Sequence, residues 1–112
     1  MRPIVVSQTG VGNSSWVRFD DYSDTAVTIQ VVNPSGATFT IQETMDDPNS
    51  PTNPVAVANV NWVNSADASV VNATGTNVAS YFAYKPVFAR LNVSVGAGTV
   101  TATFGQAGGG NY

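Results

Sequence analysis

Two segments of the chain alternate apolar and polar side chains with a period of two, and this pattern constrains the fold most. In residues 27–32 (VTIQVV) and 38–42 (TFTIQ), large apolar side chains occupy every second position. The sequence Asn33-Pro34-Ser35-Gly36 between them places Asn, Pro and Gly where type I turns favour these residues. A period of two is that of a half-buried strand. The pattern therefore predicts a β-hairpin across residues 25–45.

The second alternating segment occupies residues 87–104. The odd positions from 87 to 95 are apolar and share one face, opposite Phe88, Arg90, Asn92 and Ser94. Gly96-Ala97-Gly98 follows, and glycine tolerates the positive φ angles that tight turns need. Thr then alternates with apolar residues from 99 to 104. This segment predicts a second β-hairpin.

The rest of the chain gives shorter signals. Residues 15–19 (SWVRF) and 80–84 (SYFAY) predict short strands, residues 55–63 alternate loosely, and residues 46–54 contain three prolines and predict a loop. The chain has 18 Val and 12 Thr but a single Leu, and β-branched side chains favour strands over helices. We expect an all-β fold, an antiparallel β-sandwich or jelly-roll-like domain of six to eight strands.

The length of 112 residues fits a single domain over residues 1–112. Within it we expect an extended N-terminal segment of about residues 1–14 and a Gly-rich C-terminal tail at residues 105–112. The expected core residues are Trp16, Val27, Ile29, Val31, Phe39, Ile41, Leu91, Val93 and Phe104.

Charge is sparse, which bears on the choice of partner. Four basic and seven acidic residues give a net charge of −3, whereas nucleic-acid binding needs clustered Lys and Arg. We find no apolar run near the ~20 residues of a membrane span and no signal-peptide pattern at the start. We therefore expect no nucleic-acid and no membrane partner. A neutral skin of Asn, Ser, Thr and Gln suits burial in a protein interface, although many soluble proteins share it.

Patterns for catalysis or metal binding are weak. The chain has no His and no Cys, which removes histidine-based triads and the usual zinc sites. An acid pair would have to combine Glu43 with Asp46 or Asp47, or use the acidic residues of segment 20–24. Segments 20–24 and 46–49 are rich in oxygen ligands that calcium prefers, but Asp and Asn also favour turns for local reasons. We expect no enzymatic activity, no metal and no cofactor.

Aromatic and arginine side chains supply the remaining binding chemistry. The residues that could stack on a sugar or pack against a protein are Trp16, Trp62, Tyr81, Tyr84 and Tyr112. Alternation puts Trp16 and Arg18 on one face of their strand, which allows a cation–π pair. Arg18 and Arg90 are expected to form ion pairs with Asp20 or Glu43, because half-buried charges need partners.

Several short motifs carry a resemblance to a known group of proteins. They are SWVRFD at 15–20, TIQETMDDP at 40–48, PVFARLNV at 86–93 and VTATF at 100–104. In their order and spacing the chain resembles small structural proteins of tailed-bacteriophage virions, such as capsid decoration proteins or parts of the neck or tail. The resemblance implies a β-sandwich and a virion component, and it supplies no catalytic residues.

The expected function is that of a non-enzymatic virion component, most closely a capsid decoration or minor capsid protein. Its expected partners are the major capsid protein or neck and tail subunits, together with further copies of itself. It would be made in the bacterial host cytoplasm and reside in the virion. The expected interface residues are Trp16, Arg18, Asp46, Asp47, Pro48, Tyr84, Arg90 and Tyr112. The alternative is a carbohydrate-binding, receptor-facing module of a phage neck, tail or head fibre.

Overall fold

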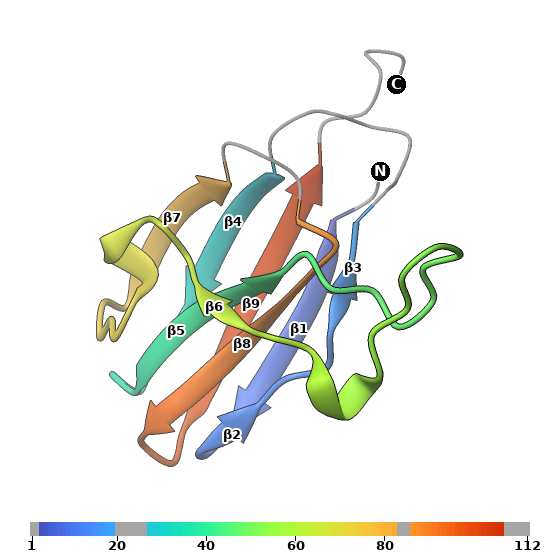
Figure 1. Ribbon diagram of the computed structural model, residues 1–112. Coiled ribbons are helices and arrows are strands. Elements are labelled where there is room, and N and C mark those ends of the chain that lie inside the picture. Colours follow the sequence, from blue (N-terminus) through green and yellow to red (C-terminus); the bar gives the residue numbers. More distant parts are fainter. Residues whose placement is uncertain (1–2, 20–26, 83–85, 107–112) are drawn as a thin grey trace.

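The computed structural model describes residues 3–19, 27–82 and 86–106, and these form two antiparallel sheets packed face to face (Figure 1). The strands are β1 (Ile4–Thr9), β2 (Gly12–Asn13), β3 (Val17–Arg18), β4 (Val27–Val32), β5 (Thr38–Thr44), β6 (Val63–Asn64), β7 (Asn77–Phe82), β8 (Phe88–Val95) and β9 (Thr99–Gln106). Two short 3₁₀ turns, η1 (Val57–Asn59) and η2 (Ala68–Val70), lie between β5 and β7. The predicted all-β sandwich is confirmed, and the described residues form nine strands where six to eight were expected.

The two sheets have simple strand orders. The four-stranded sheet runs β1-β9-β4-β7, and the five-stranded sheet runs β2-β8-β5-β6 with β3 also pairing β8. In Figure 1 the five-stranded sheet lies in front of the four-stranded sheet. All of these pairings are antiparallel.

Both predicted hairpins are wrong in their pairing, although their strands are where the alternation placed them. β4 pairs with β7 and β9, whereas β5 pairs with β8 and β6 in the other sheet. β8 and β9 are likewise in different sheets. Alternation shows that each strand buries one face, but it does not show which strand lies beside it. Two successive strands of a sandwich can bury their apolar faces equally well as neighbours in one sheet or as members of the two facing sheets.

The β4–β5 crossing, where the chain passes from the four-stranded to the five-stranded sheet, contains the predicted turn and a buried asparagine. The Gly36 N–H donates to the Asn33 carbonyl oxygen at 3.3 Å, which closes the turn. The Asn33 side chain is fully buried; its Nδ2 donates to the Ala37 carbonyl at 2.6 Å, and its Oδ1 accepts from the Ala37 N–H at 3.1 Å. One side chain thus satisfies the backbone of the residue that leads the chain into the other sheet.

The β8–β9 crossing, where the chain returns to the four-stranded sheet, packs directly against the β4–β5 crossing. Gly96 has a φ of +113°, and a Cβ there would lie 2.8 Å from the Cβ of Ala37. A Cβ at Gly98 would overlap the side chain of Ser35. Glycine is therefore required at this end of the sandwich, because the two crossings approach too closely for side chains.

The core fills the space between the sheets. Eight of the nine predicted core residues are at most 3% exposed: Val27, Ile29, Val31, Phe39, Ile41, Leu91, Val93 and Phe104. Trp16 is the exception, because it is only half-buried and lies outside the core cluster. Its neighbours Val17 and Phe19 take the inward positions, so alternation turns Trp16 outward.

Residues 4–9 and 99–106, near the two ends of the chain, are strands of the four-stranded sheet. Within the segment expected to be extended, 1–14, residues 4–9 form β1, which pairs with β9 along its whole length, and residues 12–13 form β2. Gly105 and Gln106 of the expected tail belong to β9, and residues 107–112 lie outside the described residues. The loosely alternating segment 55–63 contains η1 and the first residue of β6.

Candidate functional site

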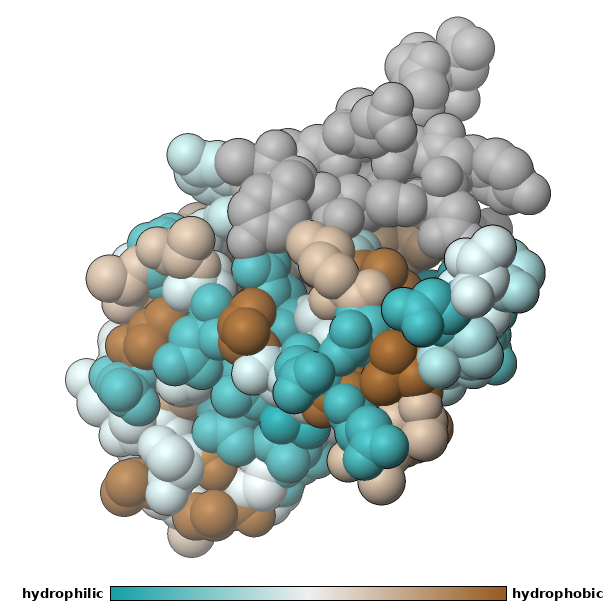
Figure 2. All heavy atoms as spheres, in the orientation of Figure 1, coloured by the Kyte–Doolittle hydropathy of each residue, from teal (hydrophilic) through white to brown (hydrophobic). Residues whose placement is uncertain are grey.

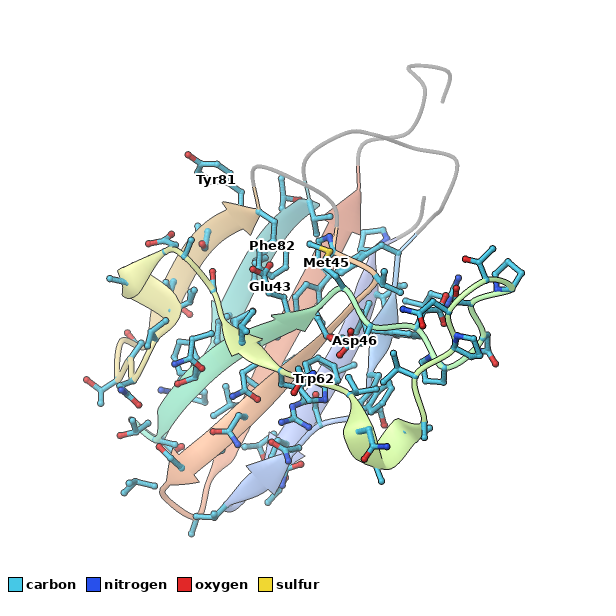
Figure 3. The ribbon with its side chains drawn as sticks, viewed as in Figure 1. Glu43, Met45, Asp46, Trp62, Tyr81 and Phe82 are labelled. Carbon is cyan, nitrogen blue, oxygen red and sulfur yellow. The ribbon has the colours of Figure 1, made fainter. Side chains whose placement is uncertain are left out.

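Three aromatic rings meet on the outer face of the five-stranded sheet. Arg18 of β3 lies opposite Phe88 of β8, and both point away from the core because Val17 and Ala89 point into it. The Trp16 ring contacts Phe88 edge-on at a centroid distance of 5.3 Å and Trp62 edge-on at 5.0 Å. Trp62 precedes β6 and lies over this face in Figure 3.

Two arginines complete this group, which we call the aromatic–arginine cluster (Trp16, Arg18, Trp62, Phe88 and Arg90). The Arg90 guanidinium lies 4.3 Å from the centroid of the Trp62 ring, and its Nε donates to Gln42 Oε1 at 2.8 Å. The Arg18 guanidinium lies 5.3 Å from the Phe88 ring centroid. Partial burial lowers the pKa of Arg90, because removal of water disfavours the charged form.

The described residues form one ion pair that was not expected and lack one that was. Arg18 pairs with Asp47, with Nη1 and Oδ1 3.4 Å apart; Asp20 lies outside the described residues. Arg90 faces Gln42 across the ladder, whereas Glu43 faces Ala89 and is buried on the opposite side of the sheet. The expected Arg90–Glu43 pair is therefore wrong, since consecutive residues of a strand point to opposite faces.

Most of the expected interface residues that can be placed come together. Trp16, Arg18 and Arg90 belong to the cluster, and Asp47 binds Arg18. Asp46 lies next to them, because its Oδ2 accepts a hydrogen bond of 2.7 Å from the backbone N–H of Asn61, beside Trp62. Pro48 follows in the same loop and is half-buried. Tyr84 and Tyr112 lie outside the described residues.

Two cluster members were missing from the expected interface. The alternation of residues 87–95 already places Phe88 on the same face as Arg90, so this residue could have been found. Trp62 was named only among the aromatic residues that could stack on a sugar or pack against a protein. The loose alternation of residues 55–63 did not place it on this face, which it reaches through tertiary contacts.

The acidic loop after β5 surrounds a separate small hollow. Its volume is about 290 Å³, and its lining residues are Met45, Asp46, Asp47, Ser50, Pro51, Asn53, Val55 and Val87. Asp47 Oδ1 accepts a hydrogen bond from the Asn49 backbone N–H at 2.8 Å, as turn-forming Asp residues do. Glu43, the proposed partner in an acid pair, does not line this hollow. Within ranges 3–19, 27–82 and 86–106, no three His, Cys, Asp or Glu side chains come together.

The outer face of the four-stranded sheet has a different character. Its outward positions hold only uncharged residues: Val5, Ser7, Thr9, Thr28, Gln30, Val32, Asn77, Ala79, Tyr81, Thr99, Thr101, Thr103 and Gly105. Hydroxyl pairs bridge β1 and β9 across it, at 3.0 Å between Ser7 and Thr101. The five-stranded side, seen in Figure 2, instead mixes apolar and strongly hydrophilic side chains.

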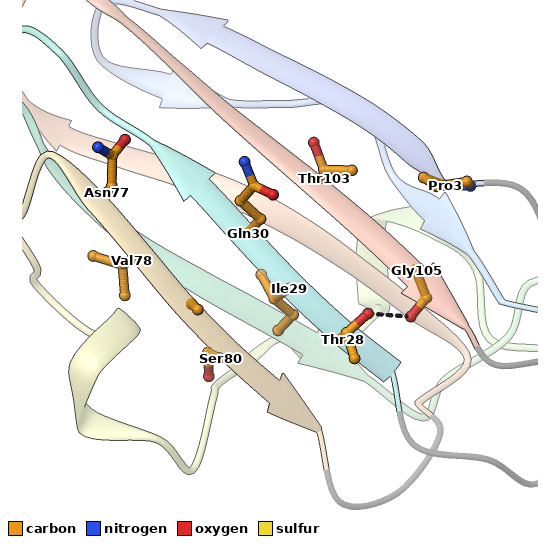
Figure 4. A pocket seen from close by; sticks show the side chains of 10 residues that line it. Pro3, Thr28, Ile29, Gln30, Asn77, Val78, Ser80, Thr103 and Gly105 are labelled. Carbon is orange, nitrogen blue, oxygen red and sulfur yellow. Dashed lines mark hydrogen bonds between the residues drawn. The ribbon is translucent and has the colours of Figure 1, made fainter.

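A shallow hollow lies on this uncharged face, over β4, β7 and β9 (Figure 4). Its volume is about 600 Å³, and its lining includes Gln30, Asn77, Ala79, Thr103 and Gly105. The small residues Ala79 and Gly105 leave this space between longer neighbours. Thr28 Oγ1 donates to the Gly105 carbonyl at 3.0 Å at one end of the hollow.

Comparison of the chain with protein families, with curated proteins and with solved structures finds no match. No helix among the described residues is long and apolar enough to cross a membrane.

Proposed function

We propose that this chain is a non-enzymatic structural component of a tailed-phage virion, of the capsid decoration or minor capsid type, which binds neighbouring virion subunits. The observation that carries the proposal is the uncharged outer face of the four-stranded sheet. None of its outward positions is charged, although Val5 and Tyr81 on it are 59% and 61% exposed.

The chemistry of this face favours a protein partner. Hydroxyl and amide groups cost less to desolvate than charges, and they find new hydrogen-bond partners in an interface. A sheet face also offers a broad area of regular backbone on which another subunit can rest. In a virion, many such contacts repeated by symmetry give strong attachment even when each one is weak.

The aromatic–arginine cluster offers a second contact on the opposite side of the molecule. Trp and Arg are enriched among the residues that dominate binding energy in protein interfaces. Here their positions are fixed in advance, because Arg90 is held by Gln42 and Trp62, and Arg18 by Asp47. Such preorganisation lowers the entropy lost on binding. A subunit with two contact faces can connect neighbours on both sides.

The alternative function, carbohydrate binding, has less support from the geometry. A sugar platform requires an open ring face on Trp or Tyr. The Arg90 guanidinium covers one face of Trp62, and Trp16 uses its ring in edge-on contacts with Trp62 and Phe88. A glycan array would support this alternative if binding were found and then lost in Trp62→Ala.

The proposal can be tested with particles of the encoding phage that lack this protein. Purified chain is mixed with empty heads and, separately, with tails, and the bound fraction is measured after sedimentation. We expect saturable binding at a fixed ratio to one of the two. Thr103→Lys, which adds a charge to the centre of the uncharged face, should abolish binding.

Val63→Lys is the matched control, because Val63 is 55% exposed on β6 of the other sheet. It should bind as the wild type does. Failure of the wild-type chain to bind heads or tails at any ratio would contradict the virion assignment. Equal binding by Thr103→Lys and Val63→Lys would exclude the uncharged face as the contact.

A further inference from the structure

Short segments of the chain cover both edges of the five-stranded sheet, whereas the four-stranded sheet ends in β1 on one side and β7 on the other. In the five-stranded sheet, β2, β3 and Ser14 pair with the outer edge of β8. The outer edge of β5 is covered by β6, Ser65 and Ala73. In the four-stranded sheet, β1 packs beside β2 and β8 of the other sheet. β7 contacts η2, and the Ser80 hydroxyl of β7 donates a hydrogen bond of 2.6 Å to Asp67 Oδ2.

β7 ends the four-stranded sheet, and its only strand partner among the described residues is β4. Natural edge strands usually carry a charge, a proline or a bulge that prevents pairing with another molecule. Asn77–Phe82 has no charge and no proline, and its register with β4 is regular. Figure 1 shows β7 at one side of the molecule, without another strand beyond it.

The register with β4 identifies which backbone groups point outward. The Asn33 N–H donates to the Thr76 carbonyl at 2.6 Å, one position beyond the Val32–Asn77 pair. Hydrogen-bonded pairs alternate in an antiparallel ladder, so Val78 and Ser80 bond to β4. The N–H and C=O groups of Asn77, Ala79 and Tyr81 therefore point away from the sheet.

We propose that β7 pairs with β7 of a second copy of this chain, antiparallel and about a two-fold axis at Ala79. In this register Ala79 faces Ala79 of the second copy, and Asn77 faces Tyr81. The outward backbone groups of all three residues are then satisfied on both chains. Both sheets also keep their apolar faces on the same side, because side-chain alternation is preserved.

Three features favour a second copy as the occupant. The outward groups are symmetric about Ala79, as a two-fold contact requires. The two edges are uncharged, so identical strands do not repel each other. Each Tyr81, which is 61% exposed, would reach the partner's face beside Asn77, where the hollow of about 600 Å³ begins. The hollow and the exposed ring thus complement each other across the axis.

The first experiment measures mass by light scattering after size exclusion, at concentrations between about 1 µM and 1 mM. We expect wild-type protein to shift from one chain to two as the concentration rises. Ala79→Lys places two like charges across the axis and should remain a monomer. Val5→Lys adds the same charge on β1, the other end strand of the sheet, and should dimerise as the wild type does.

The second experiment tests the register and does not depend on strong association. The chain has no cysteine, so a single introduced thiol reports one position. Hydrogen-bonded antiparallel partners have Cα atoms about 5.5 Å apart, which is within the range of a disulfide. With diamide as the oxidant, Ala79→Cys should form a linked dimer about tenfold faster than Val5→Cys or more.

These two experiments decide the proposal independently of the virion assignment. Far-UV circular dichroism of every variant shows whether the sheets are intact. Wild-type protein that stays monomeric throughout, or a dimer that survives Ala79→Lys, would overturn edge pairing through β7. Equal crosslinking at positions 79 and 5, or faster crosslinking at 5, would overturn the register.

Discussion

At the scale of single residues, two polar side chains decide how parts of the fold are joined. Asn33 is fully buried and bonds both backbone groups of Ala37, at the point where the chain leaves the four-stranded sheet. Asp67 caps the start of η2 and joins it to β7, because its carboxylate accepts hydrogen bonds from Ser69 of η2 and Ser80 of β7. Asn33 acts within its own turn, whereas the hydrogen bond from Ser80 to Asp67 joins two segments that are 13 residues apart.

Replacing Asn33 tests the first of these contacts. In Asn33→Ala, the N–H and C=O of Ala37 lose their partners, and each unsatisfied buried group costs about 1–3 kcal/mol. We expect a fall of roughly 2–4 kcal/mol in the free energy of unfolding, measured with urea. Pro34→Ala, at an exposed position of the same turn, is the control. A change below about 0.5 kcal/mol in Asn33→Ala would refute this role.

Asp67 predicts how stability depends on pH. Hydrogen bonds from the Ser80 hydroxyl first, and then from the backbone and hydroxyl of Ser69, lower the pKa of this carboxyl below its ordinary value of 3.8. Because the folded pKa lies below the unfolded one, the stabilisation is present above pH 3.8 and is lost as the pH falls through the lowered pKa.

Thermal melts of wild type and Asp67→Asn at several pH values measure this effect. We expect wild type to have the higher Tm near neutral pH, and the difference to narrow as the pH falls below 3.8. A Tm difference that does not change with pH would show that the charge of Asp67 is not involved.

At the scale of elements, the β4–β5 and β8–β9 crossings pack against each other at one end of the sandwich. Gly96 and Gly98 of the β8–β9 crossing pack against Ala37 and Ser35 of the β4–β5 crossing. Each crossing therefore limits the shape of the other. The strands could tolerate many apolar substitutions of similar size, but this end of the molecule allows little added volume.

Gly96→Ala tests the contact between the crossings, and Gly10→Ala is its matched control. Both glycines have positive φ, at +113° and +73°, but a Cβ at Gly10 meets nothing within 4 Å. Backbone strain should therefore lower the free energy of unfolding of both variants. Only Gly96→Ala should lose further stability, because its Cβ overlaps Ala37. We expect Gly96→Ala to be less stable than Gly10→Ala by about 1–3 kcal/mol in urea unfolding. Equal losses would mean that the crossings do not constrain each other.

At the scale of the whole molecule, the two outer faces differ in their chemistry. The five-stranded sheet carries the aromatic–arginine cluster and lies beside the acidic loop, whereas the outward positions of the four-stranded sheet are uncharged. Between successive strands of the described residues, the chain changes sheet six times: from β1 to β2, β3 to β4, β4 to β5, β6 to β7, β7 to β8 and β8 to β9. Neither sheet is a continuous piece of chain, so neither could fold without the other.

This topology predicts that the chain unfolds as one unit. Trp16 and Trp62 lie on the five-stranded sheet and report its unfolding through fluorescence, while far-UV circular dichroism reports both sheets. We expect the two urea transitions to coincide, as they do in two-state unfolding. Separate midpoints would contradict a single domain.

The expected site was recovered in part, for reasons that specific residues show. Alternation placed Trp16 with Arg18, and Phe88 with Arg90, on common faces, and the structure joins these pairs into one cluster. The same pattern could not choose ion-pair partners, and it did not indicate Asp47 as a partner of Arg18. Trp62 belongs to the segment 55–63, whose loose alternation did not predict which face of the sandwich it would contact.

The class of fold, the positions of β4, β5, β8 and β9, and the buried side of each of these four strands could be predicted from the sequence. These properties follow from the preferences of β-branched residues and from a period of two, both of which act between near neighbours. The alternation did not indicate that β4 and β5, and likewise β8 and β9, belong to opposite sheets. A hairpin and a crossing bury the same apolar face, so the choice depends on packing between residues that are distant in the chain, such as Gly96 against Ala37.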